Sequence, residues 1–185
     1  MLIEEFLAAF TLIFLAEFLD KTQILVVILA SKYGAMKTFI AAYSALLTVA
    51  ILSGLLGQFL SRMIPIARII AGITFIVSGL YFMFSRNHEI LIEDKRRIIH
   101  CYSFILLAEL GDKTQITVIT LSMICSSFAI TMLGVAIAFA IVTLVGIYMG
   151  DRLRKVSEKY EKKLNLIACT LFIVLGLFLL ISNLA

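Results

Sequence analysis

The chain has 185 residues, enough for one ordinary domain, but its composition excludes a soluble one. Hydrophobic residues make up 62% of the sequence, against about 45–50% in globular proteins, and charged residues only 15%. The mean hydropathy is +1.10. A helix needs about 20 apolar residues to cross the hydrocarbon core of a bilayer. We therefore predict an all-α membrane protein with several spans, in contact with the lipid bilayer.

Apolar runs between charged or turn-like breaks predict six transmembrane helices. The first run follows Glu4 and Glu5 rather than the basic start of a secretory signal, so we expect it to be retained as a span. The main charged loops are expected at Ser85–Ile98 and Gly150–Lys163. In chain order, the expected spans are Phe6–Ala30, Thr38–Leu60, Ile66–Phe84, Ile99–Ile124, Phe128–Met149 and Leu164–Leu184.

The positive charges indicate how these spans lie in the membrane. With six spans the loops alternate between two sides, and twelve of the 16 Lys and Arg residues fall on one side and two on the other. By the positive-inside rule the richer side is cytoplasmic, so both termini face outside. The net charge of +4 then reflects topology, and a nucleic-acid partner is not expected because the basic residues form no contiguous face. Because no targeting segment is recognisable in this short chain, we expect a prokaryotic plasma membrane.

The sequence also contains an internal repeat with an offset of 92 residues. AEFLDKTQILVVILA (Ala16–Ala30) aligns with AELGDKTQITVITLS (Ala108–Ser122), and nine of the fifteen positions are identical, including five polar ones. Each half has three spans, and an odd number inverts the second half relative to the first. Residues 1–84 are therefore predicted as one three-helix repeat, 85–98 as a cytoplasmic loop and 99–185 as an inverted repeat. Inverted repeats are typical of secondary transporters.

Both copies of the repeat place ionisable residues inside a span. Each has a Glu, an Asp three residues later and a Lys four residues later. On a continuous helix these positions share one face, so the carboxylates would be neighbours and each Glu would pair with the Lys of its own helix. The residues are Glu17, Asp20 and Lys21 in the first copy and Glu109, Asp112 and Lys113 in the second.

Further polar residues follow each acidic pair. Gln23 and Gln115 extend the same helical face with amide oxygens, since each lies three residues after an Asp. Thr22 and Thr114 point elsewhere on an ideal helix. They would join the site only if the helix were locally unwound, which Gly111 would ease in the second copy.

Six ionisable groups inside a bilayer indicate a function, because each costs about 2.5–3.5 kcal/mol on insertion scales. Glu–Lys bridges that merely join helices would leave Asp20 and Asp112 without partners. Four carboxylates against two ammonium groups leave a formal charge of −2, which one divalent cation neutralises. Carboxylate and amide oxygens suit hard cations such as Ca²⁺, Mg²⁺ and Mn²⁺. Without the metal, crowded carboxylates bind protons, so the pattern predicts cation/proton exchange.

The doubled motif resembles the paired E-x-G-D-K-T signature of the Gdt-type family of small membrane cation transporters. It is present as ELGDKT (Glu109–Thr114) and, altered, as EFLDKT (Glu17–Thr22). The resemblance covers the whole chain and implies transport of Mn²⁺ and/or Ca²⁺ in exchange for protons, with the cation as substrate and no resident cofactor. It implies Glu17, Asp20, Glu109 and Asp112 as ion ligands, supported by Lys21, Thr22, Lys113 and Thr114.

One position departs from that signature. Leu19 stands where the family motif has Gly, so we expect the first motif helix to kink less readily than the fourth and the two half-sites to differ.

The expected mechanism is cation export by alternating access, with the first and fourth spans crossing near the bilayer centre. A homo-oligomer is left open. One alternative is an exporter of amino acids or other small solutes, which would need an anion-binding feature that glutamate-paired lysines supply poorly. Another is a non-transporting helical scaffold. An enzyme is disfavoured, because no nucleophile–base set is visible in the sequence.

Overall fold

The computed structural model describes residues 2–18, 20–63, 67–84 and 98–184, and in these ranges the chain forms helices joined by short turns. The described residues contain no strand, which confirms the all-α prediction. The expected loop at 85–97, Leu19, and the side chains of Lys21 and residues 150–162 lie outside the description. The helices are α1 (Leu2–Glu17), α2 (Lys21–Tyr33), α3 (Ala35–Met63), α4 (Ala67–Phe84), α5 (Ile98–Glu109), α6 (Lys113–Ile124) and α7 (Phe128–Leu184).

The two motif spans are interrupted, which corrects the expectation of continuous helices. The first expected span, Phe6–Ala30, consists of α1 and α2, and the fourth, Ile99–Ile124, consists of α5 and α6. In the second case Gly111 has a φ of +81°, a left-handed conformation that no α-helix contains. Each later half-helix begins directly after a motif Asp.

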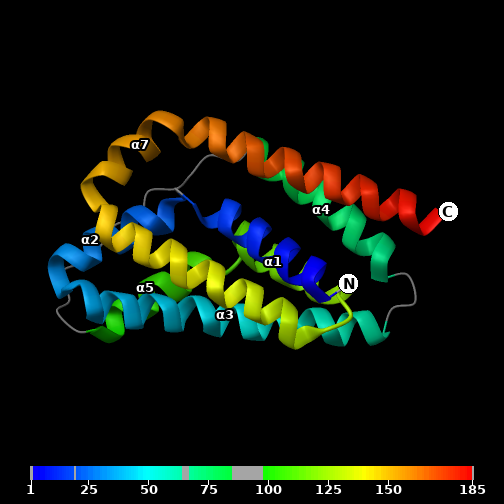
Figure 1. Ribbon diagram of the computed structural model, residues 1–185, viewed down its shortest axis with the longest axis horizontal. Coiled ribbons are helices and arrows are strands. Elements are labelled where there is room, and N and C mark those ends of the chain that lie inside the picture. The colour runs from blue at the N-terminus through cyan, green and yellow to red at the C-terminus, as the bar shows by residue number, and fades with distance from the viewer. Residues whose placement is uncertain (1, 19, 64–66, 85–97, 185) are drawn as a thin grey trace.

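The expected loop Gly150–Lys163 is helical, which is a second correction. The spans Phe128–Met149 and Leu164–Leu184 belong to one helix, α7, and Figure 1 shows this helix turning back so that its yellow and red parts run beside different helices. After Gly150, the intervening segment DRLRKVSEKYEKK is rich in Lys, Glu and Arg, all strong helix formers, and contains neither Pro nor a further Gly. Its charge makes it hydrophilic without making it a loop.

α4 and the last part of α7 approach each other closely through small residues. A Cβ at Gly79 would lie 2.8 Å from the carbonyl oxygen of Cys169, and one at Gly176 would lie 2.6 Å from that of Gly72. An offset of 97 residues relates FIVSGLY (Phe75–Tyr81) to FIVLGLF in the second half. The same offset takes Gly79 to Gly176 and Gly72 to Cys169, so each of these two contacts is the counterpart of the other. The α4–α7 interface is therefore symmetric, with equivalent contacts made by equivalent residues of the two halves.

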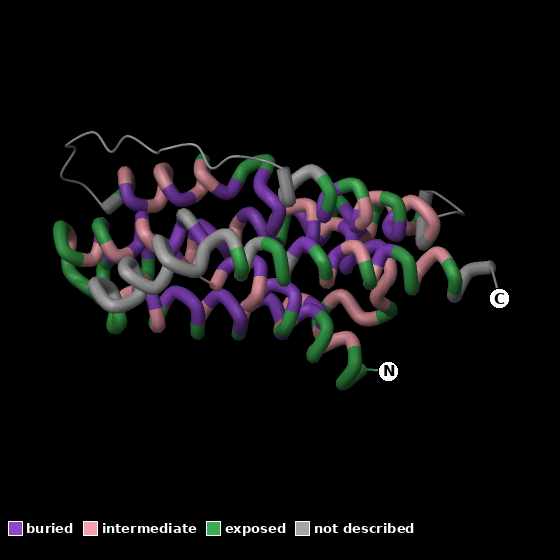
Figure 2. The backbone as a smooth tube through the Cα atoms, turned by 90° about the horizontal axis from the view of Figure 1, so that it is seen from above, coloured by how far each residue is buried: buried purple, intermediate pink, exposed green. Residues whose placement is uncertain are grey.

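The outer surface of the bundle is apolar. Figure 2 shows the buried segments facing one another between the helices and the exposed ones outside, and large side chains such as Leu52, Leu107 and Phe178 are 62–65% exposed. Among the described residues, two helical stretches, Ala35–Arg62 and Phe128–Met149, are long and apolar enough to span a membrane. The motif helices are shorter because each is interrupted.

Glu5 joins the start of α1 to the turn between α6 and α7. Its carboxylate accepts hydrogen bonds from the backbone N–H of Ser126 (3.0 Å), the hydroxyl of Ser126 (2.5 Å) and the backbone N–H of Ser127 (3.1 Å). Partial burial raises the pKa of Glu5, but these hydrogen bonds outweigh it and hold the pKa below the ordinary value of 4.5. The ionised carboxylate therefore stabilises this end of the bundle.

We expect Glu5→Gln to lower the melting temperature at neutral pH by about 2–4 °C, the shift that 1 kcal/mol produces in a protein of this size. Because the pKa is lowered on folding, the contribution of Glu5 is present above its unfolded pKa and is lost as the pH falls through the folded one. The difference between variant and wild type should thus disappear in acid. The melting temperature can be measured with a thiol-reactive dye, which labels the buried Cys101 and Cys169 when the protein unfolds. Equal melting temperatures of variant and wild type at neutral pH would contradict the prediction.

Candidate cation site

The two helix breaks have the same backbone geometry at their aspartates. Asp20 has φ −76° and ψ 169°, and Asp112 has φ −84° and ψ 169°. The Asp20 N–H donates to the Glu17 carbonyl (3.1 Å), as the Asp112 N–H does to the Glu109 carbonyl (3.2 Å). The first motif is therefore interrupted as fully as the second, and the expectation that Leu19 would keep it straighter is wrong.

The motif aspartates occupy helix N-cap positions but do not cap. An N-cap Asp usually accepts a hydrogen bond from a backbone N–H of the first turn through its side chain, and neither Asp20 nor Asp112 makes such a bond. Oδ2 of Asp20 is buried and has no hydrogen-bond partner. The positive ends of the α2 and α6 dipoles favour negative charge at these two residues. The Asp20 side chain thus reaches groups outside its own helix.

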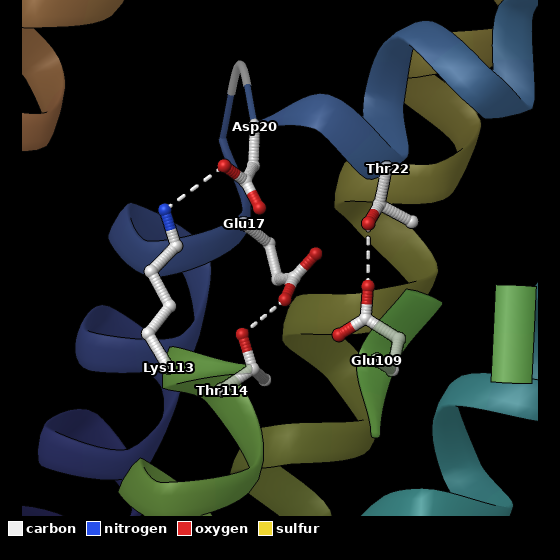
Figure 3. A network of polar contacts seen from close by, with 6 residues as sticks. All are labelled: Glu17, Asp20, Thr22, Glu109, Lys113 and Thr114. Atoms are coloured by element: carbon white, nitrogen blue, oxygen red, sulfur yellow. Dashed lines mark hydrogen bonds and ion pairs between the residues drawn. The ribbon is translucent and has the colours of Figure 1, made fainter. Parts of the chain in front are cut away.

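Reciprocal hydrogen bonds join the two breaks (Figure 3). The Thr22 hydroxyl donates to Oε1 of Glu109 at 2.5 Å, and the Thr114 hydroxyl donates to Oε1 of Glu17. The 92-residue offset exchanges one bond for the other. The threonines reach the site because the helices are unwound between Glu and Lys, as predicted for the case of local unwinding. Each motif glutamate is therefore held by the threonine of the other half.

An ion pair also crosses between the halves. Nζ of Lys113 lies 3.0 Å from Oδ1 of Asp20, and the two side chains are 10% and 8% exposed. The expected pairing of Lys113 with Glu109 along one helix is wrong, because the chain is not helical between them. The matching Glu17–Lys21 pair involves a side chain outside the description.

The four motif carboxylates are buried close together. Glu17 and Glu109 are 1% exposed, Asp20 8% and Asp112 9%, and they lie within electrostatic range of one another. Oε2 of Glu17, like Oδ2 of Asp20, is buried without a hydrogen-bond partner. In the part of the chain that is described, however, no three His, Cys, Asp or Glu residues are grouped as they are around a bound metal. Glu109, Glu17 and Asp20 each contact a threonine or lysine of the other half instead.

The two motif glutamines have different surroundings, which the expectation of a shared face had missed. Oε1 of Gln115 accepts a hydrogen bond from the N–H of Gly111 (2.6 Å) and so supports the second break. Gln23 is buried and packs against Gly146 of α7, where an added Cβ would lie 3.2 Å from the Gln23 Cδ. The sequence signal for Gly146 was its alignment with Gly54 at the 92-residue offset.

Interrupted helices from two repeats, with buried charges at the breaks and an apolar exterior, are typical of secondary transporters in membranes. The family model for the divalent cation/proton antiporter GDT1 matches residues 5–90 and 97–185. The chain therefore belongs to this family of integral membrane antiporters, which confirms the resemblance seen in the doubled motif. Searches of curated proteins and of solved structures find no match.

Proposed function

We propose that the protein exports Mn²⁺ and/or Ca²⁺ in exchange for protons, through a single buried site made by the four motif carboxylates. Family membership supports divalent cation/proton antiport. The observation that carries the site is the reciprocal pair of Thr–Glu hydrogen bonds, which brings the two breaks together. The proposed ligands are Glu17, Asp20, Glu109 and Asp112.

The proposed architecture is six spans in two inverted repeats, residues 1–84 and 99–185, joined by a cytoplasmic segment at 85–98. Three observations support it: the contacts that exchange under the repeat offsets, the two stretches of similar length matched by the family model, and the concentration of Lys and Arg on one side. Both termini would then face outside, in a prokaryotic plasma membrane. Rocking of the halves about the site would give alternating access.

The chemistry of the site suits a hard divalent cation. The unpartnered oxygens of Glu17 and Asp20 are buried acceptors. The hydroxyls of Thr22 and Thr114 donate their protons to glutamates, so they present only lone pairs to a third group. Oxygen ligands of this kind suit Ca²⁺ and Mn²⁺. Because metal and protons compete for the same carboxylates, occupancy by one excludes the other.

The direction of transport follows from the pH gradient once the electrical work of the two ions is balanced. Each charge moved across the membrane is worth about 2.3 kcal/mol per 100 mV, so expelling a divalent cation from a negative interior is opposed. Entry of about two protons balances that electrical work, and a pH gradient that is acid outside adds a further driving force. Export is therefore the favourable direction.

An amino-acid exporter remains the second candidate for this architecture. Its substrate carboxylate would need a buried cation, and Lys113, the buried ammonium described at the site, is paired with Asp20. This pairing disfavours anion recognition.

Transport by the purified protein in liposomes tests the proposal. With Mn²⁺, Ca²⁺ and Mg²⁺ supplied in turn and a pH probe inside, we expect Mn²⁺ or Ca²⁺ flux about tenfold or more above empty vesicles, with protons moving the opposite way. Labelled amino acids provide the arm for the second candidate. Cation fluxes equal to those of empty vesicles would show that the transporter proposal is wrong.

A further inference from the structure

Lys113 places a cation of the protein's own at the proposed cation site. Its ammonium group lies 3.0 Å from Oδ1 of Asp20, and both side chains are at least 90% buried. The two residues are 93 positions apart and come from opposite halves. The ammonium therefore compensates a proposed ligand of the other half from within the protein.

The Lys113 ammonium contacts Oδ1 of Asp20 and leaves Oδ2 without a hydrogen-bond partner, so a metal ion on Oδ2 would share this carboxylate with the ammonium. A divalent cation bound by this carboxylate would face a like charge on the neighbouring ammonium in a medium of low dielectric, where repulsion is strong. Lysine carries its charge on a flexible four-carbon stem, so the ammonium can move off Asp20 without movement of the α6 backbone. Repulsion across this one carboxylate thus favours departure of the ammonium when the substrate binds.

The Lys113–Asp20 pair neutralises a buried carboxylate in the cation-free carrier. After release of the substrate, buried carboxylates must be neutralised before the halves can change orientation, because an uncompensated buried charge is costly. Protons neutralise some of them in an antiporter. Lys113 neutralises Asp20 without any ion from solution.

We propose that Lys113 is a tethered counter-cation: it occupies Asp20 while the substrate is absent, leaves when the cation binds, and permits the cation-free carrier to return. The inference rests on the proposed function and adds a specific role to it. It assigns Lys113 to one half of the transport cycle, since the cation-loaded carrier does not use the pair.

Two transport modes separate this role from simple joining of helices. In cation–cation exchange, with Mn²⁺ on both sides and tracer on one, the carrier reorients only while loaded. In net Mn²⁺/proton exchange it must also return without the cation. A joint between helices would be needed equally in both modes.

The experiment compares these modes in liposomes for wild type, Lys113→Gln, Lys113→Met and Lys113→Arg, with Lys37→Gln as a matched control at an exposed lysine of α3. For Lys113→Gln and Lys113→Met we expect net exchange to fall about tenfold or more while tracer exchange stays within about threefold of wild type. Lys113→Arg keeps the charge and should retain net exchange within about threefold. Lys37→Gln should change neither mode.

Each outcome either supports or overturns the role of Lys113 as a tethered counter-cation, or overturns the proposed function. A proportional loss of both modes in the neutral variants, whether through misfolding or through a joining role, overturns the inference, as does an unchanged net exchange. A melting temperature measured with the thiol-reactive dye distinguishes misfolding of the variant from loss of a joining role. Lys113→Met is included because, unlike Lys113→Gln, it buries no unpaired amide. Absence of both modes in the wild type would instead overturn the proposed function.

Discussion

Glu109→Gln and Glu17→Gln should each reduce cation transport by about 100-fold or more, as expected when one charged group is removed from a buried network. Both glutamates are 1% exposed and accept a hydrogen bond from a threonine of the other half. Glutamine has nearly the same shape and its oxygen can still accept that bond. It lacks the negative charge that a divalent cation requires, so binding is lost while the contact between the halves remains.

The melting temperature of these variants should stay equal to that of wild type or rise, because replacing a buried charge removes its desolvation cost. Glu5→Gln is the matched control, since it makes the same chemical change in α1 at a residue away from the site. It should show the reverse pattern, with reduced melting temperature and normal flux. Measured flux within about threefold of wild type in both site variants would remove these glutamates from the proposed ligands.

The sequence predicted those features of the fold that depend on composition and local pattern. The apolar runs placed the end of the fourth span at Ile124 and the start of the fifth at Phe128 correctly, because lipid-facing and buried helices both require long apolar stretches. The polar identities in the repeat identified the residues of the two breaks. They could do so because five polar side chains in register inside a span are not produced by apolar composition.

The sequence did not predict the helix breaks or the pairing across them. Positions four residues apart share one face of a continuous helix, and local spacing therefore favoured Glu109–Lys113 as a pair. The observed partner of Lys113 is Asp20, 93 positions away. Such a contact depends on how the halves pack, which no local rule contains. Hydropathy likewise missed the helix at residues 150–163, because it measures polarity and not helix propensity.

Gly111→Val and Gly34→Val form the second decisive comparison, because the two glycines share a positive φ and open space where a Cβ would be added. Gly111 has a φ of +81° and Gly34 a φ of +90°, and an added Cβ would meet nothing within 4 Å at either. Both substitutions thus impose backbone strain of about 1–2 kcal/mol or more, and both should lower the melting temperature.

Only Gly111→Val should affect transport. Gly111 lies between Glu109 and Asp112, and its N–H is bound by Gln115, so relief of strain there moves the start of α6 and with it Asp112 and Lys113. Misplacement of a functional group by about 1 Å can cost about 100-fold, and we expect a loss of that order in Mn²⁺ or Ca²⁺ flux. Gly34 separates α2 from α3, outside the breaks, and its variant should transport normally once folded. Equal flux in the two variants would mean that the shape of the break does not govern the site.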